Sequence, residues 1–206
     1  MSATAELEAA APSTYGRDAS TARFSVARYE RMIEEGILKR EHPVELLENY
    51  VVLKMPGSLR HDGTVQILVK RLGRRLPHGW DIRSQSAIRL DDSQPEPDLA
   101  IVRGDEATYL ARHPSAEDIG LVVEVADSSL LRDQRDKSRI YARAGIAAYW
   151  ILNLADQWVE VHTAPSGATE APGFMASRMY ESGESVPLSL PGAESMSIPV
   201  DEVFPE

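Results

Sequence analysis

The chain has 206 residues, of which 43% are hydrophobic and 26% charged, and its formal net charge is −10. It contains no cysteine, which excludes disulfides, thiolate catalysis and zinc sites built on sulfur. No apolar run approaches the roughly 20 residues that cross a bilayer, and the first residues show no secretory signal. We therefore expect a cytoplasmic protein with no membrane partner.

The negative charge is concentrated in residues 155–206, whereas residues 23–154 are neutral. Within the neutral part, residues 60–90 carry seven Lys or Arg against two Asp. A basic surface for nucleic acid is therefore compatible with the overall acidity. The solvated face of a helix explains the same basic residues equally well.

The first residues of the chain are predicted to lie outside the folded domain. Residues 1–22 are rich in Ala, Ser and Thr without periodicity, which predicts a disordered leader before a single domain at 23–206. Ser25 is a favourable N-cap for a short helix, and Gly36 would end that helix.

The next segment predicts a hairpin followed by a helix. Residues 44–55 are rich in β-forming side chains around a polar pair, Glu48 and Asn49, which predicts two strands and a tight turn. From Thr64 the apolar residues recur every three or four positions, as in an amphipathic helix. Its outward face would carry four basic side chains that are candidates for phosphate contacts: Lys70, Arg71, Arg74 and Arg75.

Strands dominate the rest of the chain, with one long helix among them. The helix is expected from Ser128 or Ser129 to Ala144, where Gly145 would stop it. Because strands outnumber helices and are interrupted by them, the fold class is α/β or mixed α+β. The expected strands lie at 81–90, 98–102, 120–126, 148–153, 157–163, 175–180 and 196–200.

Two carboxylates in core-like strands need a chemical explanation. Glu124 lies inside the apolar run LVVEVA, where an ionised side chain is costly unless it is paired or bound to a cation. Asp98 follows Pro95-Glu96-Pro97, which delivers it in extended conformation to the start of the strand DLAIV. If the two strands are neighbours, the two carboxylates lie close together and repel each other, and a bound divalent cation would offset this repulsion. The simpler alternatives are that Glu124 lies at a sheet edge or pairs with an arginine, and that Asp98 only initiates a strand.

A lysine on the following helix can complete such a site. Lys137 and Tyr141 share one helical face, and two acids with a lysine around a metal would suit phosphodiester hydrolysis. A surface ion pair between Lys137 and Asp133, four residues earlier, is the alternative. The five histidines are scattered without ligand spacing, so a histidine metal site is not indicated.

An ordered set of motifs resembles the Uma-type restriction-endonuclease family of the PD-(D/E)XK nuclease superfamily. The resemblance runs from about residue 25 to the C-terminus and is most specific at 95–153. It implies a restriction-endonuclease-like core, with a central mixed β-sheet flanked by helices. The motifs are VELL with a histidine sixteen residues after its glutamate, PEPDLAIV, LVVEVADSS and DKSRIYARAGIAAYWILN.

The resemblance also implies a site. Asp98, Glu124 and the carbonyl of Val125 would bind Mg²⁺ or Mn²⁺, and Glu45 matches an acidic position beside the metal. The superfamily's usual lysine position is occupied here by Ala126, so the lysine would come from the next helix as Lys137. Two further positions, His61 and Tyr141, match recurrent family positions without an assigned role.

The leading hypothesis is a metal-dependent endonuclease-like phosphodiester hydrolase that acts on DNA. Many nucleases of this fold are dimers because two strands need two active sites, so a homodimer is expected. A catalytically inactive module that binds nucleic acid or protein is the alternative, favoured by the neutral middle of the chain and the displaced lysine. Hydrolysis of another phosphate ester is a third reading, since the same side chains do not specify their substrate.

Overall fold

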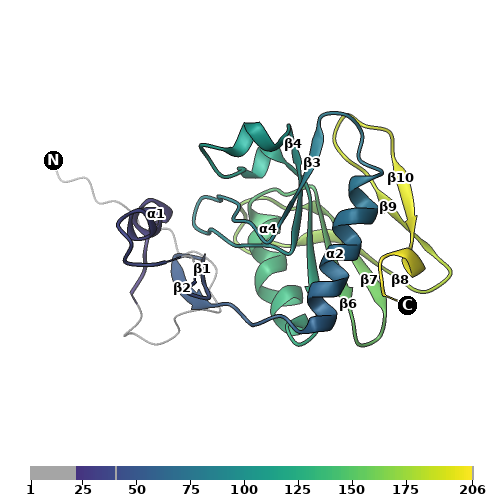
Figure 1. Ribbon diagram of the computed structural model, residues 1–206, viewed down its shortest axis with the longest axis horizontal. Helices are drawn as coiled ribbons and strands as arrows, with labels where there is room; N and C mark the ends of the chain where they lie inside the picture. The colour runs from purple at the N-terminus through teal and green to yellow at the C-terminus, as the bar shows by residue number, and fades with distance from the viewer. Residues whose placement is uncertain (1–21, 40, 206) are drawn as a thin grey trace.

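A mixed six-stranded sheet forms the centre of the protein (Figure 1). The computed structural model describes residues 22–39 and 41–205, so the expected leader lies, apart from its last residue, outside the described residues. The sheet order is β3-β4-β5-β6-β7-β8, in which only β5 and β6 are parallel neighbours. This arrangement confirms the expected α/β class. The strands are β3 (Trp80–Ser84), β4 (Leu99–Arg103), β5 (Ile119–Ala126), β6 (Ala148–Asn153), β7 (Trp158–Pro165) and β8 (Phe174–Tyr180).

Helix α2 (Leu59–Gly73) covers one face of this sheet (Figure 1). Its apolar stripe of Val65, Leu68 and Leu72 is fully buried, as the three-four spacing predicts. The C-terminal part of the chain extends the same core with β9 (Ser185–Leu188), β10 (Met196–Pro199) and the 3-10 turn η4 (Val200–Glu202).

The opposite face is covered by the segment that connects the two parallel strands. Parallel neighbours need a crossover connection, and here it consists of α3 (Leu130–Arg132), a π-helical turn η3 (Asp133–Lys137) and α4 (Ser138–Arg143). Ile140 and Tyr141 pack against the sheet. The single helix expected from Ser128 or Ser129 is therefore interrupted by a π turn, a local insertion that often occurs at functional sites.

A hairpin and a short helix form an appendage beside the sheet (Figure 1). Strands β1 (Val44–Leu47) and β2 (Tyr50–Leu53) are joined by Glu48 and Asn49, whose φ angles of 50° and 69° define the predicted tight turn. Helix α1 (Val26–Glu34) has the expected N-cap Ser25 and packs on the hairpin.

Several boundaries differ from the expected ones. Helix α2 begins at Leu59, five residues before the expected start at Thr64. The earlier start is explained by Ser58, whose side chain caps the helix by accepting a hydrogen bond from the His61 amide. The strand expected at 81–90 ends at Ser84, since Gln85 has a φ of 46°, outside the extended conformation of a strand. Strand β9 was not predicted, nor were the 3-10 turns η1 (Glu106–Tyr109) and η2 (Ala116–Asp118). None of the helices in residues 22–39 and 41–205 combines the length and apolarity needed to cross a bilayer.

A buried cluster of charges attaches the hairpin to α4. Glu48, only 5% exposed, accepts hydrogen bonds from Arg139 at 2.6 Å and from Arg143 at 2.9 Å. Arg143 also pairs with Asp92 at 2.8 Å. These contacts join residues that are far apart in the sequence, so they fix the hairpin beside α4, the helix that directly follows Lys137.

We expect Glu48→Gln to lower the free energy of unfolding by about 3 kcal/mol, because Arg139 and Arg143 lose their shared buried carboxylate, although Arg143 keeps its pair with Asp92. Urea denaturation of the variant and the parent measures the difference. Glu35→Gln is the matched control, since Glu35 forms an exposed pair with Arg31 that is worth less than about 0.5 kcal/mol. Equal losses in the two variants would contradict the structural role of Glu48.

Candidate active site

Neighbouring strands place Asp98 and Glu124 on the same face of the sheet. Strands β4 and β5 are antiparallel with Leu99 opposite Val123, which brings Asp98, the residue before β4, opposite Glu124. Side chains alternate along a strand, so both residues face the side covered by α4. Both line one cleft of about 510 Å³. The prediction that the two strands are neighbours is thus confirmed.

The cleft is rich in charge of both signs. Acidic side chains outnumber basic ones, and an excess of carboxylates in a confined space favours binding of a cation. The carboxylates are Glu45, Glu96, Asp98, Glu124, Asp127 and Asp133, and the basic groups are Lys54, His61, Arg132 and Lys137.

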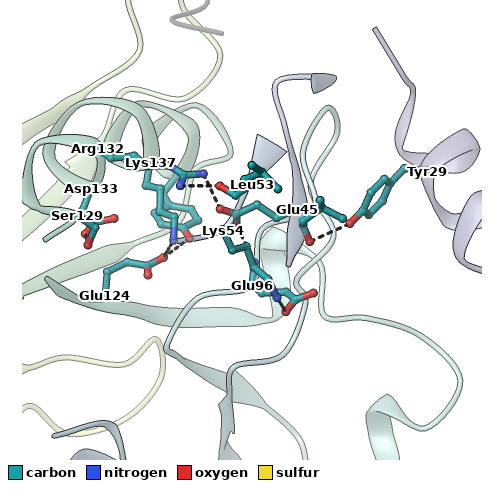
Figure 2. Close-up of polar contacts among 12 residues, drawn as sticks. Tyr29, Glu45, Leu53, Lys54, Glu96, Glu124, Ser129, Arg132, Asp133 and Lys137 are labelled. Carbon is teal, nitrogen blue, oxygen red and sulfur yellow. Dashed lines mark hydrogen bonds and ion pairs between the residues drawn. The ribbon is translucent and has the colours of Figure 1, made fainter. Parts of the chain in front are cut away.

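Glu124 is engaged by the helix packed above it. The residue is 3% exposed, and its Oε1 accepts hydrogen bonds from Lys137 Nζ at 2.8 Å and from the Tyr141 hydroxyl at 2.7 Å (Figure 2). Burial raises the pKa of the Glu124 carboxyl to about 8, although the Lys137 ammonium opposes this rise. A further cation beside Glu124 would therefore stabilise its ionised form. The alternatives of a sheet-edge or arginine-paired glutamate are wrong, because Glu124 lies in a central strand and pairs with lysine.

The π turn directs Lys137 into the cleft. Lys137 is 8% exposed and bonds to Glu124, so the alternative of a surface pair with Asp133 is wrong. Desolvation by burial lowers the pKa of Lys137, but attraction from neighbouring carboxylates, Glu124 first, outweighs it and the net shift is upward. Lys137 is therefore an ammonium group that lies beside the Glu124 carboxyl.

Asp98 is engaged at both of its oxygens. Its Oδ2 accepts a hydrogen bond from the Val125 amide at 2.8 Å, and its Oδ1 lies 3.0 Å from His61 Nε2. The other imidazole nitrogen of His61, Nδ1, is 3.0 Å from Asp62 Oδ1. The hydrogen bond to Asp98 raises the pKa of His61 to about 9, against the lowering effect of burial.

We expect the metal-free protein to lose stability in alkaline solution through His61. The folded-state pKa of about 9 lies above the ordinary value of 6.5, so the protonated imidazole stabilises the fold fully below pH 6.5. This contribution is lost as the pH rises through 9, and it amounts to about 2–3 kcal/mol. Chemical denaturation in EDTA at pH 6 and pH 10 should show a smaller loss in His61→Gln than in the parent, and the difference between the two losses is the contribution of His61.

The exposed His78 provides the control for this measurement. His78→Gln should show the same pH dependence of unfolding as the parent. A pH dependence that is unchanged in His61→Gln would contradict the assigned ion pair.

Glu45 lines the cleft, is buried, and pairs with an arginine that the sequence did not single out. Arg132 Nη2 donates to Glu45 Oε1 at 2.8 Å, and its Nη1 donates to the Leu53 carbonyl at 3.2 Å (Figure 2). Lys54 pairs with Glu96 at 2.6 Å beside them. Arg132 precedes Lys137 by five residues, about one π turn, a relation that becomes visible only in the folded chain.

The basic residues predicted for the outward face of α2 lie apart from this cleft, and Arg74 and Arg75 follow the end of the helix at Gly73 instead of lying within it. Lys70 and Arg74 are exposed, while Arg75 pairs with Glu202 at 2.6 Å and Arg71 lies 3.9 Å from the same carboxylate. None of the four basic residues lines the cleft in the described part of the chain. The acidic C-terminal segment thus neutralises part of this face.

The chemical types of the donor atoms in the cleft are those that bind a divalent cation. Carboxylate oxygens are the ligands that Mg²⁺ and Mn²⁺ favour, and Asp98, Glu124 and Val125 line the same cavity. No three Asp, Glu or His side chains within residues 22–39 and 41–205 are already gathered around one point as a metal site. A bound ion would therefore have to displace hydrogen bonds that now engage the two carboxylates.

Comparison with known proteins gives a family and a fold. The family model described as "Uma2: Putative restriction endonuclease" matches residues 26–200. A crystal structure from Anabaena variabilis ATCC 29413, titled "a putative nuclease belonging to DUF820", superposes with a TM-score of 0.63 at 12% sequence identity. The superposition covers 88% of this chain and 97% of that one. No curated protein sequence matches the chain.

Proposed function

This chain belongs to the Uma2 family, described as "Putative restriction endonuclease", and we propose that it is a metal-dependent endonuclease that hydrolyses phosphodiester bonds in DNA. The observation that carries the proposal is the juxtaposition of Asp98 and Glu124 on adjoining strands, with the Lys137 ammonium 2.8 Å from Glu124. Two carboxylates and a buried ammonium in one cleft are the components expected of hydrolytic phosphoryl chemistry.

Asp98 and Glu124 would hold a divalent cation, with the carbonyl of Val125 as a further ligand. Such a cation, when bound, supplies Lewis acidity toward the phosphate and makes water a stronger nucleophile. Lys137 has ammonium protons beyond the one given to Glu124, and these can orient a water molecule or contact a phosphate oxygen. Tyr141 positions Glu124 through its hydroxyl and does not itself need to reach the substrate.

Glu45 and Arg132 act together in this proposal. The 2.8 Å ion pair holds the guanidinium at the cleft wall, where its positive charge suits a phosphate group. Glu45 is then the residue that positions Arg132, as well as a negative group near the cation. The basic face of Lys70, Arg71, Arg74 and Arg75 remains a candidate for contacts with more distant phosphates.

We further propose that residues 23–206 function as one domain and that two copies associate, since cleavage of both DNA strands requires two active sites. Sedimentation measurements with and without DNA test this association. A monomer at all concentrations, free and bound, would remove the dimer from the proposal.

Incubation of the purified chain with supercoiled plasmid tests the function itself. Nicked and linear DNA should accumulate with Mg²⁺ or Mn²⁺ and should not form in EDTA. DNA binding without cleavage under every metal condition would favour the alternative of an inactive binding module. That alternative is supported by the hydrogen bonds that engage both carboxylates in the described structure.

A further inference from the structure

We propose that His61 is a third protein ligand of the cation and makes the site selective for Mn²⁺ over Mg²⁺. This inference rests on the proposed function, because it concerns the same cleft. The sequence did not indicate a histidine metal site, since His61 has no second histidine at ligand spacing. Only the folded structure shows that His61 lies beside Asp98.

The distance between His61 and Asp98 equals the separation of two ligands of one ion. His61 Nε2 lies 3.0 Å from Asp98 Oδ1. Two donors that each bind a cation at about 2.1 Å, at right angles, are about 3.0 Å apart. The cation can thus take the place of the proton that the two groups now share, with little movement of either side chain. Glu124, from the adjoining strand, would complete the set after rotating toward the ion.

The imidazole is already oriented for such a role. Metal-binding histidines usually donate their second ring nitrogen to a carboxylate, which fixes the tautomer. Asp62 Oδ1 lies 3.0 Å from His61 Nδ1 and provides this partner. A proton on Nδ1 leaves the lone pair on Nε2, the nitrogen that faces Asp98.

The loop before α2 keeps the ring in this orientation. A Cβ placed on Gly57 would lie 2.7 Å from His61 Nδ1 and 2.8 Å from Asp62 Oδ1, closer than a side chain can approach. The absence of a side chain at Gly57 therefore makes room for the His61–Asp62 pair. The His61 side chain is 12% exposed, which leaves it accessible to an ion that enters the cleft.

A nitrogen ligand changes which ion binds best. Mg²⁺ favours an oxygen environment and retains its waters, whereas imidazole is an ordinary ligand of transition metals. A site with two carboxylates and one imidazole should bind Mn²⁺ more tightly than Mg²⁺. The preference should depend on His61 more than on any other group in the cleft.

Titration of the full-length, metal-free chain with Mn²⁺ and separately with Mg²⁺, in the absence of DNA, measures this preference. Calorimetry gives the two dissociation constants, and pulsed electron paramagnetic resonance of bound Mn²⁺ detects a directly coordinated ¹⁴N nucleus. In His61→Gln we expect Mn²⁺ affinity to fall at least about tenfold, with at most about a twofold change for Mg²⁺. The ¹⁴N signal should disappear in the same variant.

Two further variants separate a local effect from a general one. Gly57→Ala retains the imidazole but displaces it, so it should also weaken Mn²⁺ binding. His78→Gln removes an exposed histidine outside the cleft and should bind both ions like the parent. Circular dichroism confirms that each variant is folded before titration.

The outcomes distinguish this inference from the proposed function. If Asp98→Asn abolishes binding but His61→Gln retains the parent affinity and the parent shows no ¹⁴N signal, the inference is overturned and the carboxylate site remains. If the parent binds neither ion at millimolar concentration, both the inference and the metal-dependent function fail.

Discussion

Asp98→Asn is expected to reduce metal-dependent DNA cleavage at least about a thousandfold while the protein remains folded. The substitution removes a negative ligand, and the loss of a bound cation costs several kcal/mol of transition-state stabilisation, or about 10³ in rate at 4 kcal/mol. The amide oxygen of Asn can still accept the Val125 hydrogen bond that Asp98 accepts at 2.8 Å. Single-turnover nicking of supercoiled plasmid measures the rate, and thermal unfolding checks the fold.

Glu124→Gln should behave in the same way, because the second carboxylate of the pair is lost. Asp91→Asn is the matched control, since Asp91 is exposed and does not line the cleft. It should cleave like the parent. Parent-like nicking by both Asp98→Asn and Glu124→Gln would refute the assignment of the active site.

Lys137→Met is expected to reduce cleavage by about a hundredfold or more and also to destabilise the protein. It removes the ammonium that lies 2.8 Å from Glu124 and leaves a buried carboxyl without its cation. Such an unpaired buried charge costs about 3–5 kcal/mol. The pKa of Glu124, already raised by burial, should rise further, so the folded variant retains a proton that the unfolded chain releases. The destabilisation relative to the parent should consequently be greater at pH 9 than at pH 5, because the parent's Glu124 ionises at about pH 8 and the variant's at higher pH.

A double variant separates the two roles of this lysine. Combining Lys137→Met with Glu124→Gln removes both charges and should restore much of the stability at pH 9, but no cleavage. Denaturation at the two pH values and the nicking assay report the two effects independently. Lys39→Met, at an exposed position, should leave both unchanged. A stability loss in Lys137→Met that is equal at pH 5 and pH 9 would argue against a buried carboxylate left unpaired.

Local patterns were sufficient for most of the secondary structure. Three-four spacing identified α2, Ser25 marked the start of α1, and Glu48-Asn49 marked the hairpin turn. The failures have local causes as well. Gln85 shortened a predicted strand through its positive φ, and the π turn at Asp133–Lys137 interrupted a helix whose sequence is compatible with a regular one.

The carboxylate pair could also be predicted from the sequence, because a charge inside an apolar strand requires a partner. Asp98 directly precedes one strand and Glu124 lies in the neighbouring strand, and the crossover segment that follows carries Lys137. The partners of Asp98 and Glu45 could not be predicted in this way. His61 reaches Asp98 from the start of α2, and Arg132 reaches Glu45 across 87 residues.

Most of the helices and strands, their order, the family resemblance and the buried residues that need a counter-charge can be read from the amino-acid sequence. Which charged groups pair with one another is established only by the packing of distant segments. Hydrophobic periodicity specifies which face of an element is buried, but it carries no information on which distant polar groups meet at the end of a sheet. The pairing of His61 with Asp98, of Arg132 with Glu45 and of Glu202 with Arg75 follows from how α2, the hairpin and the C-terminal segment pack around β4 and β5.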